Sequence, residues 1–143
     1  MNQQSDFRIK DGFDQMDFDK VQAMLEKVFW SIGIKKEEII QGAKNSALLV
    51  GVFNSGGQIG FARVISDKTR FAYIMDVVVD KNYRKQGIGQ LMIRYILNHP
   101  DLNDVYQWLL KTKDAHGVYE KVGFRLIPDP ERWMGIMHER PER

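Results

Sequence analysis

Residues 75–92 have the sequence MDVVVDKNYRKQGIGQLM, in which the hydrophobic pattern changes halfway. The first part contains three consecutive β-branched valines, which are typical of a buried strand. From Ile88 onward, apolar residues recur at i, i+3, i+4, i+7 and i+8, which is the spacing of one helix face. The stretch therefore predicts a strand, a tight glycine turn and a helix, in that order.

The turn between this strand and this helix is suited to binding a phosphate. The first N–H groups of a helix lack backbone partners and carry a partial positive charge, so a helix N-terminus favours an anion. Gly87 and Gly89 have no side chain that would keep a phosphate away from those N–H groups, and Arg84 and Lys85 add full positive charges. An ordinary turn flanked by solvated cations is the alternative interpretation of the same residues.

The composition is that of an ordinary globular protein. The chain has 143 residues, 43% of them hydrophobic and 28% charged, so we expect one domain over residues 1–143, with residues 1–5 disordered. The net charge of +2 is too small to favour nucleic-acid binding. The chain has no cysteine, which excludes disulfides and thiolate metal ligands. There is no apolar run of about 20 residues and no signal-peptide core, so we expect a cytoplasmic protein that does not span a membrane. We also expect no bound metal ion.

The other segments predict a mixed arrangement of strands and helices. Apolar periodicity and turn residues indicate strands at residues 7–10, 47–53, 58–65, 71–79, 105–111 and 132–137. Helical spacing follows Asp17 and continues, more weakly, at residues 36–44. A last short helix is expected to open at Asp114 and to end at Gly123.

This order of elements predicts an α/β fold around one mixed sheet. Strands 47–53, 58–65 and 71–79 are joined by short turns, so they should be antiparallel. Strands 71–79 and 105–111 are joined by a helix, so they should be parallel, with a right-handed crossover. The preceding hairpins and the absence of a third glycine argue against a Rossmann dinucleotide unit.

Two motifs resemble the GNAT superfamily of N-acetyltransferases. The family pattern Arg/Gln-x-x-Gly-x-Gly/Ala is matched in full by RKQGIG at residues 84–89. The pattern Leu-Tyr-Glu-Lys-x-Gly-Phe is matched by VYEKVGF at residues 118–124 except for Val118 in place of Leu. Residues 114–124 are most similar to a bacterial subgroup with the sequence Asp-Ala-His-Gly-Leu-Tyr-Glu-Lys-x-Gly-Phe. The resemblance covers residues 7–137. It implies antiparallel N-terminal strands, parallel fourth and fifth strands that splay apart, and helices on both faces of the sheet.

The resemblance also implies acetyl-CoA as cosubstrate. Its pantetheine arm would pair with the backbone of residues 77–79, and its pyrophosphate would lie on the N–H groups of residues 85–90. Arg84 would fix the loop or touch the phosphate, and Thr112 stands where many relatives have an asparagine that binds pantetheine. The expected contact residues are Val77, Val78, Val79, Arg84, Lys85, Gln86, Gly87, Ile88, Gly89, Gln90, Thr112 and Tyr119.

Tyr119 resembles the general acid of the family. The implied reaction is direct attack of a primary amine on acetyl-CoA in a ternary complex, which releases a thiolate. A tyrosine of pKa about 10 is a weaker acid than a thiol of pKa about 8.5, by roughly 2 kcal/mol, so a hydrogen bond to the thiolate is more favourable than full proton transfer. A tyrosine packed in the core is the alternative for Tyr119.

The group that accepts the proton of the amine is left open. An alkylamine of pKa about 10.4 is neutral only about one time in 2,500 at pH 7, so something must accept its proton. Asp76 is the only carboxylate within the strand, but alternation places it on the face opposite Met75 and Val77. Either a bulge turns Asp76 toward the site as the base, or Asp76 is structural and water accepts the proton. A histidine such as His116, near a helix N-terminus, is more often a surface or capping residue.

Two other functions are compatible with these residues. One is an acyl-CoA-binding regulatory module without turnover. The other is nucleic-acid binding through Arg84, Lys85 and the basic turn at residues 68–70, which the low net charge disfavours. The acceptor amine, a small molecule or a peptide, is open, as is the choice between a monomer and a homodimer formed through an edge strand and residues 133–137.

Overall fold

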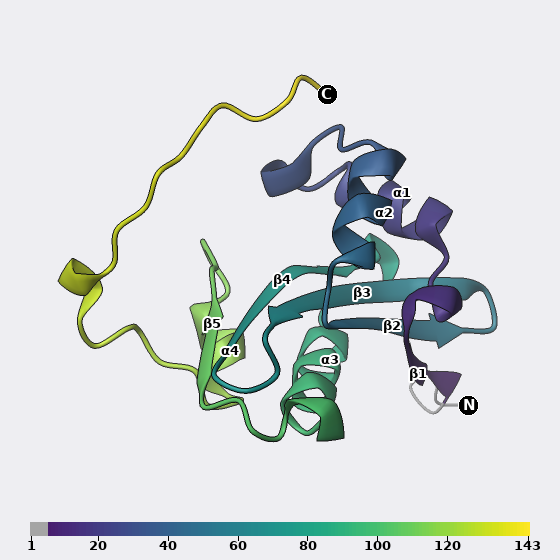
Figure 1. Ribbon diagram of the computed structural model, residues 1–143. Helices are drawn as coiled ribbons and strands as arrows, with labels where there is room; N and C mark the ends of the chain where they lie inside the picture. Colours follow the sequence, from purple (N-terminus) through teal and green to yellow (C-terminus); the bar gives the residue numbers. More distant parts are fainter. Residues whose placement is uncertain (1–5) are drawn as a thin grey trace.

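One mixed five-stranded sheet forms the centre of the molecule (Figure 1). The computed structural model describes residues 6–143, so the expected disorder of residues 1–5 lies outside the described part. The strands, adjacent in chain order, are β1 (Arg8–Asp11), β2 (Leu48–Asn54), β3 (Gly57–Ser66), β4 (Phe71–Val79) and β5 (Gln107–Leu110). The pairs from β1 to β4 are antiparallel and the β4–β5 pair is parallel, which confirms the predicted mixed sheet.

Helices cover both faces of this sheet, also as predicted (Figure 1). Helices α1 (Phe18–Leu25) and α2 (Lys36–Lys44) lie on one face, α3 (Ile88–Leu97) lies on the other, and the short α4 (His116–Glu120) follows β5. Each face has its own apolar core: Met92 and Ile96 pack on the α3 side, and Leu49 and Phe61 pack on the α1–α2 side. Within residues 6–143, no helix is long and apolar enough to span a bilayer.

Several element boundaries agree with the sequence predictions because they are set by local chemistry. Asp17 caps α1, since its carboxylate accepts hydrogen bonds from the N–H groups of Asp19 and Lys20.

The predicted fifth strand, residues 105–111, is shorter in the structure. Val105 is buried before β5 begins, and its N–H donates to the carbonyl of Leu102 instead of joining the sheet.

The prediction of a last strand at residues 132–137 is wrong. Residues 125–143, here called the C-terminal segment, contain one 3-10 turn, Pro130–Arg132, and no strand. The segment curves away from the sheet and returns toward α1 and α2 (Figure 1). Prolines and glycines are depleted in strands; Gly135 lies within residues 132–137, and Pro128 and Pro130 lie just before them.

Candidate active site

The strands β4 and β5 diverge at their carboxyl ends. Residues 71–74 of β4 pair with residues 107–110 of β5, but β4 continues to Val79 and β5 ends at Leu110. The edge of β4 over residues 75–79 therefore has no β5 partner, which is the predicted splay. A pocket of about 460 Å³ lies at this divergence. It brings together four of the expected site residues, Asp76, Val77, Thr112 and Tyr119, and is also lined by Met75 and Leu110.

A β-bulge in β4 lies beside this pocket. Between the two pairs Phe61–Val78 and Arg63–Met75, β3 advances by two residues and β4 by three, so β4 contains one extra residue. Asp76 has a φ of 57°, a left-handed conformation that aspartate tolerates better than most residues. Because a bulge bends its strand and interrupts the alternation of side chains, the simple face assignment for Asp76 does not hold here.

The carboxylate of Asp76 is bound by an arginine of the neighbouring strand. Arg63 Nε lies 2.7 Å from Asp76 Oδ2, and the two side chains are only 15% and 14% exposed. Arg63 Nη1 also donates to Ser46 Oγ at 3.3 Å, just after α2. Asp76 thus joins β4 to β3 and to the end of α2, and it also lines the pocket. Its role as the base remains a prediction.

The N-terminus of α3 is an open backbone cradle. Gly87 is the N-cap residue, with a φ of 80° and no side-chain cap. The first helical hydrogen bond runs from Leu91 N–H to the Gly87 carbonyl, 2.9 Å, and no other group of residues 6–143 accepts from the N–H groups of residues 88–90. A Cβ on Gly87 or Gly89 would meet no atom within 4 Å. Free N–H groups with open space before them fit a pyrophosphate.

The residues around the cradle differ in what they can offer a ligand. Arg84 Nε donates to the Val79 carbonyl at 3.1 Å, so Arg84 fixes the loop, which is one of its two expected roles. Lys85 adopts a φ of 65°, and its side chain, like that of Gln86, is exposed. Ile88 is buried, so it offers only its backbone.

Two of the valines of β4 are oriented differently with respect to the pocket. Val77 lines the pocket, whereas the side chain of Val78 is buried in the core beneath α1 and α2. A contact between Val78 and pantetheine would therefore have to use backbone atoms. Gln90, at the far side of the cradle, is half-buried in the first turn of α3.

Tyr119 enters the pocket from α4. Its ring packs edge-on against Phe124, with centroids 6.1 Å apart, and burial raises the pKa of its hydroxyl. Tyr119 is therefore protonated at neutral pH and able to donate. Thr112 Oγ1 accepts from Ala115 N–H at 3.0 Å at the start of α4, which leaves the hydroxyl proton of Thr112 to donate elsewhere. The helix begins at His116, not at Asp114 as predicted, and His116 is exposed.

Other pocket residues could not be assigned from the sequence. Phe29 and Trp30 come from the loop between α1 and α2, whose apolar residues have no regular period. Lys113 follows β5, and Arg140 belongs to the C-terminal segment. The contact between Arg140 and Trp30 joins residues 110 positions apart, so only the fold reveals it.

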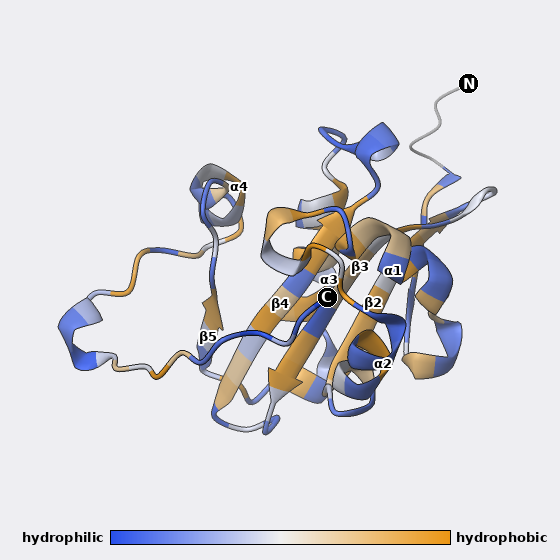
Figure 2. Ribbon diagram, turned by 90° about the horizontal axis from the view of Figure 1, so that it is seen from above, coloured by the Kyte–Doolittle hydropathy of each residue, from blue (hydrophilic) through white to orange (hydrophobic). Residues whose placement is uncertain are grey.

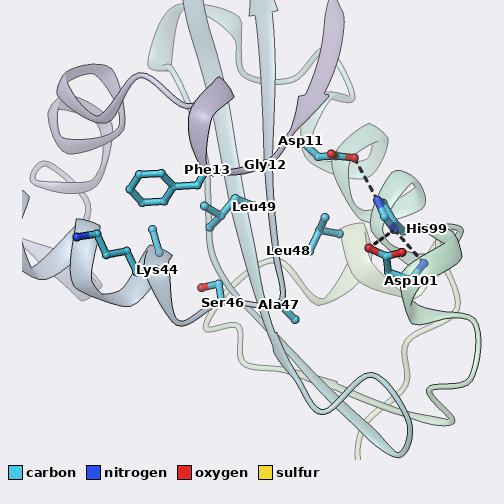
Figure 3. A pocket seen from close by; sticks show the side chains of 11 residues that line it. Asp11, Gly12, Phe13, Lys44, Ser46, Ala47, Leu48, Leu49, His99 and Asp101 are labelled. Carbon is cyan, nitrogen blue, oxygen red and sulfur yellow. Dashed lines mark hydrogen bonds and ion pairs between the residues drawn. The ribbon is translucent and has the colours of Figure 1, made fainter.

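A second pocket, of about 360 Å³, lies where β1 and β2 meet the end of α3 (Figure 3). Asp11 accepts hydrogen bonds there from the Tyr95 hydroxyl and from His99 Nε2, the latter at 3.1 Å. His99 Nδ1 accepts from Asp101 N–H at 3.2 Å, which leaves Nε2 as the donor to Asp11. No predicted site residue lines this pocket. Within residues 6–143, no group of three or more histidines and carboxylates could hold a metal ion.

Comparison with known sequences agrees with the two motifs. A family profile described as "Acetyltransferase (GNAT) domain" matches residues 44–126. The uncharacterized N-acetyltransferase ycf52 of Gracilaria tenuistipitata var. liui is 31% identical over 124 residues, covering 78% of this chain and 65% of that protein. Its counterpart from Pyropia yezoensis is 28% identical, covering 78% of this chain and 68% of that protein. The chain thus spans about two thirds of the length of these relatives.

Solved structures show the same fold. A protein of Xanthomonas campestris pv. campestris, described as "a putative acetyltransferase belonging to the gnat family", has a TM-score of 0.86 and 29% identity over 92% of this chain and 93% of that chain. A protein of Clostridium acetobutylicum, described as a "predicted acetyltransferase with acetyl-CoA", has a TM-score of 0.69 over 92% of this chain and 96% of that chain. At 15% identity, this second likeness shows the fold alone. On the family profile, the motifs and the fold together, the chain belongs to the GNAT superfamily of acetyltransferases.

Proposed function

We propose that this protein transfers the acetyl group of acetyl-CoA to a primary amine in a ternary complex. The observation that carries the proposal is the pocket between β4 and β5, where an unpaired strand edge and the hydroxyl of Tyr119 share one cavity. The glycine cradle at the end of the same strand supports it. The Clostridium acetobutylicum structure contains acetyl-CoA, and the ycf52 relatives are named N-acetyltransferases.

Acetyl-CoA would bind along β4, with its pyrophosphate at the N-terminus of α3. The free N–H groups of residues 88–90 supply donors there, and Lys85 adds an exposed positive charge. The pantetheine amides would pair with the open edge of β4 at Val77 and Val79, as an added half-strand does. The Thr112 hydroxyl would donate one further hydrogen bond. In this arrangement the thioester would lie between β4 and β5, beside Tyr119.

The transfer needs one bond to form and one to break. The neutral amine nitrogen attacks the carbonyl carbon of the thioester, the new C–N bond forms, and the C–S electron pair leaves with the sulfur as a thiolate. Tyr119 donates its hydroxyl hydrogen bond to that sulfur as the charge develops. Because burial raises the pKa of Tyr119, the hydroxyl keeps its proton at pH values where the amine is becoming neutral.

The proton lost by the amine passes, in this proposal, to water in the open pocket. The carboxylate of Asp76 is bound by Arg63, so we assign Asp76 the task of holding the bulge. Replacing a true general base lowers kcat by about 10²- to 10⁴-fold. Asp76→Asn, which keeps the shape of the side chain, should therefore lower kcat by less than about tenfold. A loss of about 10²-fold or more in a variant that stays folded would make Asp76 the base.

Calorimetry with acetyl-CoA and CoA tests the binding site. Gly89 lies in open space and has no strained φ, so Gly89→Glu places a carboxylate in the cradle without a steric clash. The matched control is Ala23→Glu, which adds the same charge to the exposed face of α1. We expect micromolar binding by the wild type and the control, and loss of at least about tenfold in Gly89→Glu. A folded wild type that binds neither ligand would refute the proposal.

Turnover with a panel of primary amines tests the chemistry. Tyr119→Phe should bind acetyl-CoA as the wild type does but lower kcat by about 10²-fold, because the developing thiolate loses its donor. Wild-type binding without turnover of any amine would favour the acyl-CoA-binding regulatory module. Salt-sensitive DNA binding without CoA binding would favour the nucleic-acid alternative.

A further inference from the structure

Two positive side chains from distant parts of the chain meet at one wall of the pocket. Lys113 Nζ lies 4.9 Å from the ring centroid of Phe29. Arg140 Nη1 donates to the carbonyl of Trp30 at 2.5 Å. The rings of Phe29 and Trp30 pack edge-on, with centroids 5.2 Å apart. Both cations thus contact one pair of adjacent residues, at the side of the pocket formed by the loop between α1 and α2.

These two cations have no acidic partner in the part of the chain that the structure describes. Among residues 6–143, no carboxylate oxygen lies within 4.0 Å of the charged nitrogens of Lys113 or Arg140. The acidic residues of the pocket lining are Asp76, whose charge is compensated by Arg63, and Asp114. A further cation, Lys111, lines the same pocket. The lining of the pocket is therefore net positive.

This charge is unfavourable for a simple amine. At pH 7 an alkylamine arrives almost entirely as an ammonium ion, which like charges at the wall repel. An amine that also carries a carboxylate or a phosphate reverses the sign of that interaction. The Arg140 guanidinium has N–H donors beyond the one used by Trp30, and their fixed planar geometry suits two oxygens of an anion.

We propose that the acceptor is a primary amine bearing an anionic group, held by Arg140 and Lys113 while the amine faces the thioester. This inference rests on the acetyl-transfer function proposed above. The cradle at α3 provides a separate site for the phosphates of acetyl-CoA, so the wall at Phe29 and Trp30 is left for the acceptor. Arg140 makes the C-terminal segment part of the substrate site.

Matched acceptor pairs test the charge requirement directly. Phenylalanine and phenethylamine differ by a carboxylate, as do 4-aminobutyrate and propylamine, and phosphoethanolamine and ethanolamine differ by a phosphate. We expect kcat/KM to be at least about tenfold higher for the anionic member of one or more pairs, and the advantage to shrink as salt is added. The pairs also distinguish a carboxylate from a phosphate as the recognised group. Equal values, or a preference for the neutral member in every pair, would overturn the inference.

Variants of the two cations assign the effect to this wall. Arg140→Gln and Lys113→Gln should each lower the preference for the anionic acceptor, measured as its kcat/KM divided by that of the neutral acceptor, by about tenfold. The loss should come from a higher KM for the anionic acceptor. Arg140→Lys should restore part of the ratio. Arg132→Gln is the matched control, since Arg132 belongs to the same C-terminal segment but is exposed and pairs with Asp129.

The outcomes separate this inference from the function on which it rests. If acetyl-CoA binds and neutral amines are turned over as well as anionic ones, acetyl transfer stands and the anionic acceptor is refuted. If Arg140→Gln instead raises KM for acetyl-CoA, the wall binds the cosubstrate, and the inference again fails. If the wild type neither binds acetyl-CoA nor acetylates any amine, the proposed function itself fails.

Discussion

The segment from β4 through α3, residues 71–97, and the C-terminal segment, residues 125–143, both contain large apolar residues close together in sequence, but these are held in opposite ways. In the first, the side chains of Met92, Ile93 and Ile96 are completely buried beneath the sheet. In the second, Met134 is 98% exposed, and its neighbours Ile136 and Met137 are also exposed. The hydropathy colouring of Figure 2 marks apolar residues in both regions.

The difference shows that apolar content does not by itself place a segment in the core. In the β4–α3 segment, β4 alternates with a period of two and α3 has a helical period, so the apolar side chains face the packed cores on the two sides of the sheet. The C-terminal segment lacks such a period. Within residues 6–143, Arg125 donates to the nearby Glu120 carbonyl at its start, and its hydrogen bonds to distant elements are those of Arg140 with Trp30 and Arg143 with Glu38. The β4–α3 segment supplies a wall of the pocket through β4, whereas the C-terminal segment contributes the side chain of Arg140 to the pocket lining.

The largest expected effect compares two methionines. Met92→Ala empties a packed site under the sheet and should lower the free energy of unfolding by about 2–5 kcal/mol. Met134→Ala removes the same atoms from an exposed position and should change it by less than about 0.5 kcal/mol. Urea denaturation of both variants measures the contrast. A loss above about 1 kcal/mol in Met134→Ala would mean that the C-terminal segment is packed against something in solution.

The ion pair at the bulge should have the next largest effect. Asp76→Asn leaves the Arg63 guanidinium nearly buried without its counter-ion, so the free energy of unfolding should fall by about 2 kcal/mol. Adding Arg63→Gln removes the unpaired charge and should recover part of that loss. A double-mutant cycle in urea measures the coupling. If the two single losses simply add, the pair does not stabilise the bulge.

Tyr95 tests the contact between β1 and α3 through the pH dependence of the free energy of unfolding. Its hydrogen bond to Asp11 raises the pKa of Tyr95 to about 12, above the usual value of 10.0. The folded state then holds this proton where the unfolded state has lost it, so the stabilisation is complete below about pH 10 and disappears as pH rises to about 12. Tyr95→Phe should cost about 1 kcal/mol at pH 7 and flatten the alkaline limb. An unchanged alkaline limb would contradict this role.

Among the variants that remove a polar contact, the smallest effect is expected at the end of the C-terminal segment. Arg143→Gln removes an ion pair with the partly exposed Glu38, so the free energy of unfolding should change by less than about 1 kcal/mol. The amides of residues 134–143 form no backbone hydrogen bond with the described residues and should exchange quickly with deuterium in wild type and variant alike. Slow exchange there would show that the two regions are held equally firmly.

The β4–α3 segment could be predicted from the sequence because local interactions determine its structure. The valines of β4, the helical period of α3 and the glycines between them act over a few residues, and the cradle is made of backbone. The bulge at Asp76 could not be predicted, because it depends on how β3 and β4 align. From the residues alone, a bulge at Asp76 is one of two open alternatives.

The position of Arg140 in the pocket lining could not be predicted from the sequence, for a different reason. Arg140 reaches the site only because the C-terminal segment leaves α4 and returns to the loop between α1 and α2. The strand predicted at residues 132–137 needed a free strand edge with which to pair, and the sequence pattern contains no information on whether such an edge is within reach. The two failures have a common cause, which is the path of one irregular segment.

The contact between Arg140 and Trp30 also has a consequence for the order of folding. Strands β2, β3 and β4 pair with their neighbours along the chain, so only short loops must close to form them. The Arg140 contact closes a loop of 110 residues, with an entropic cost of about 4 kcal/mol by simple chain statistics. We therefore expect a refolding chain to regain the sheet first and the Arg140 contact last. Acetyl-CoA binding should then recover before the preference among acceptors does.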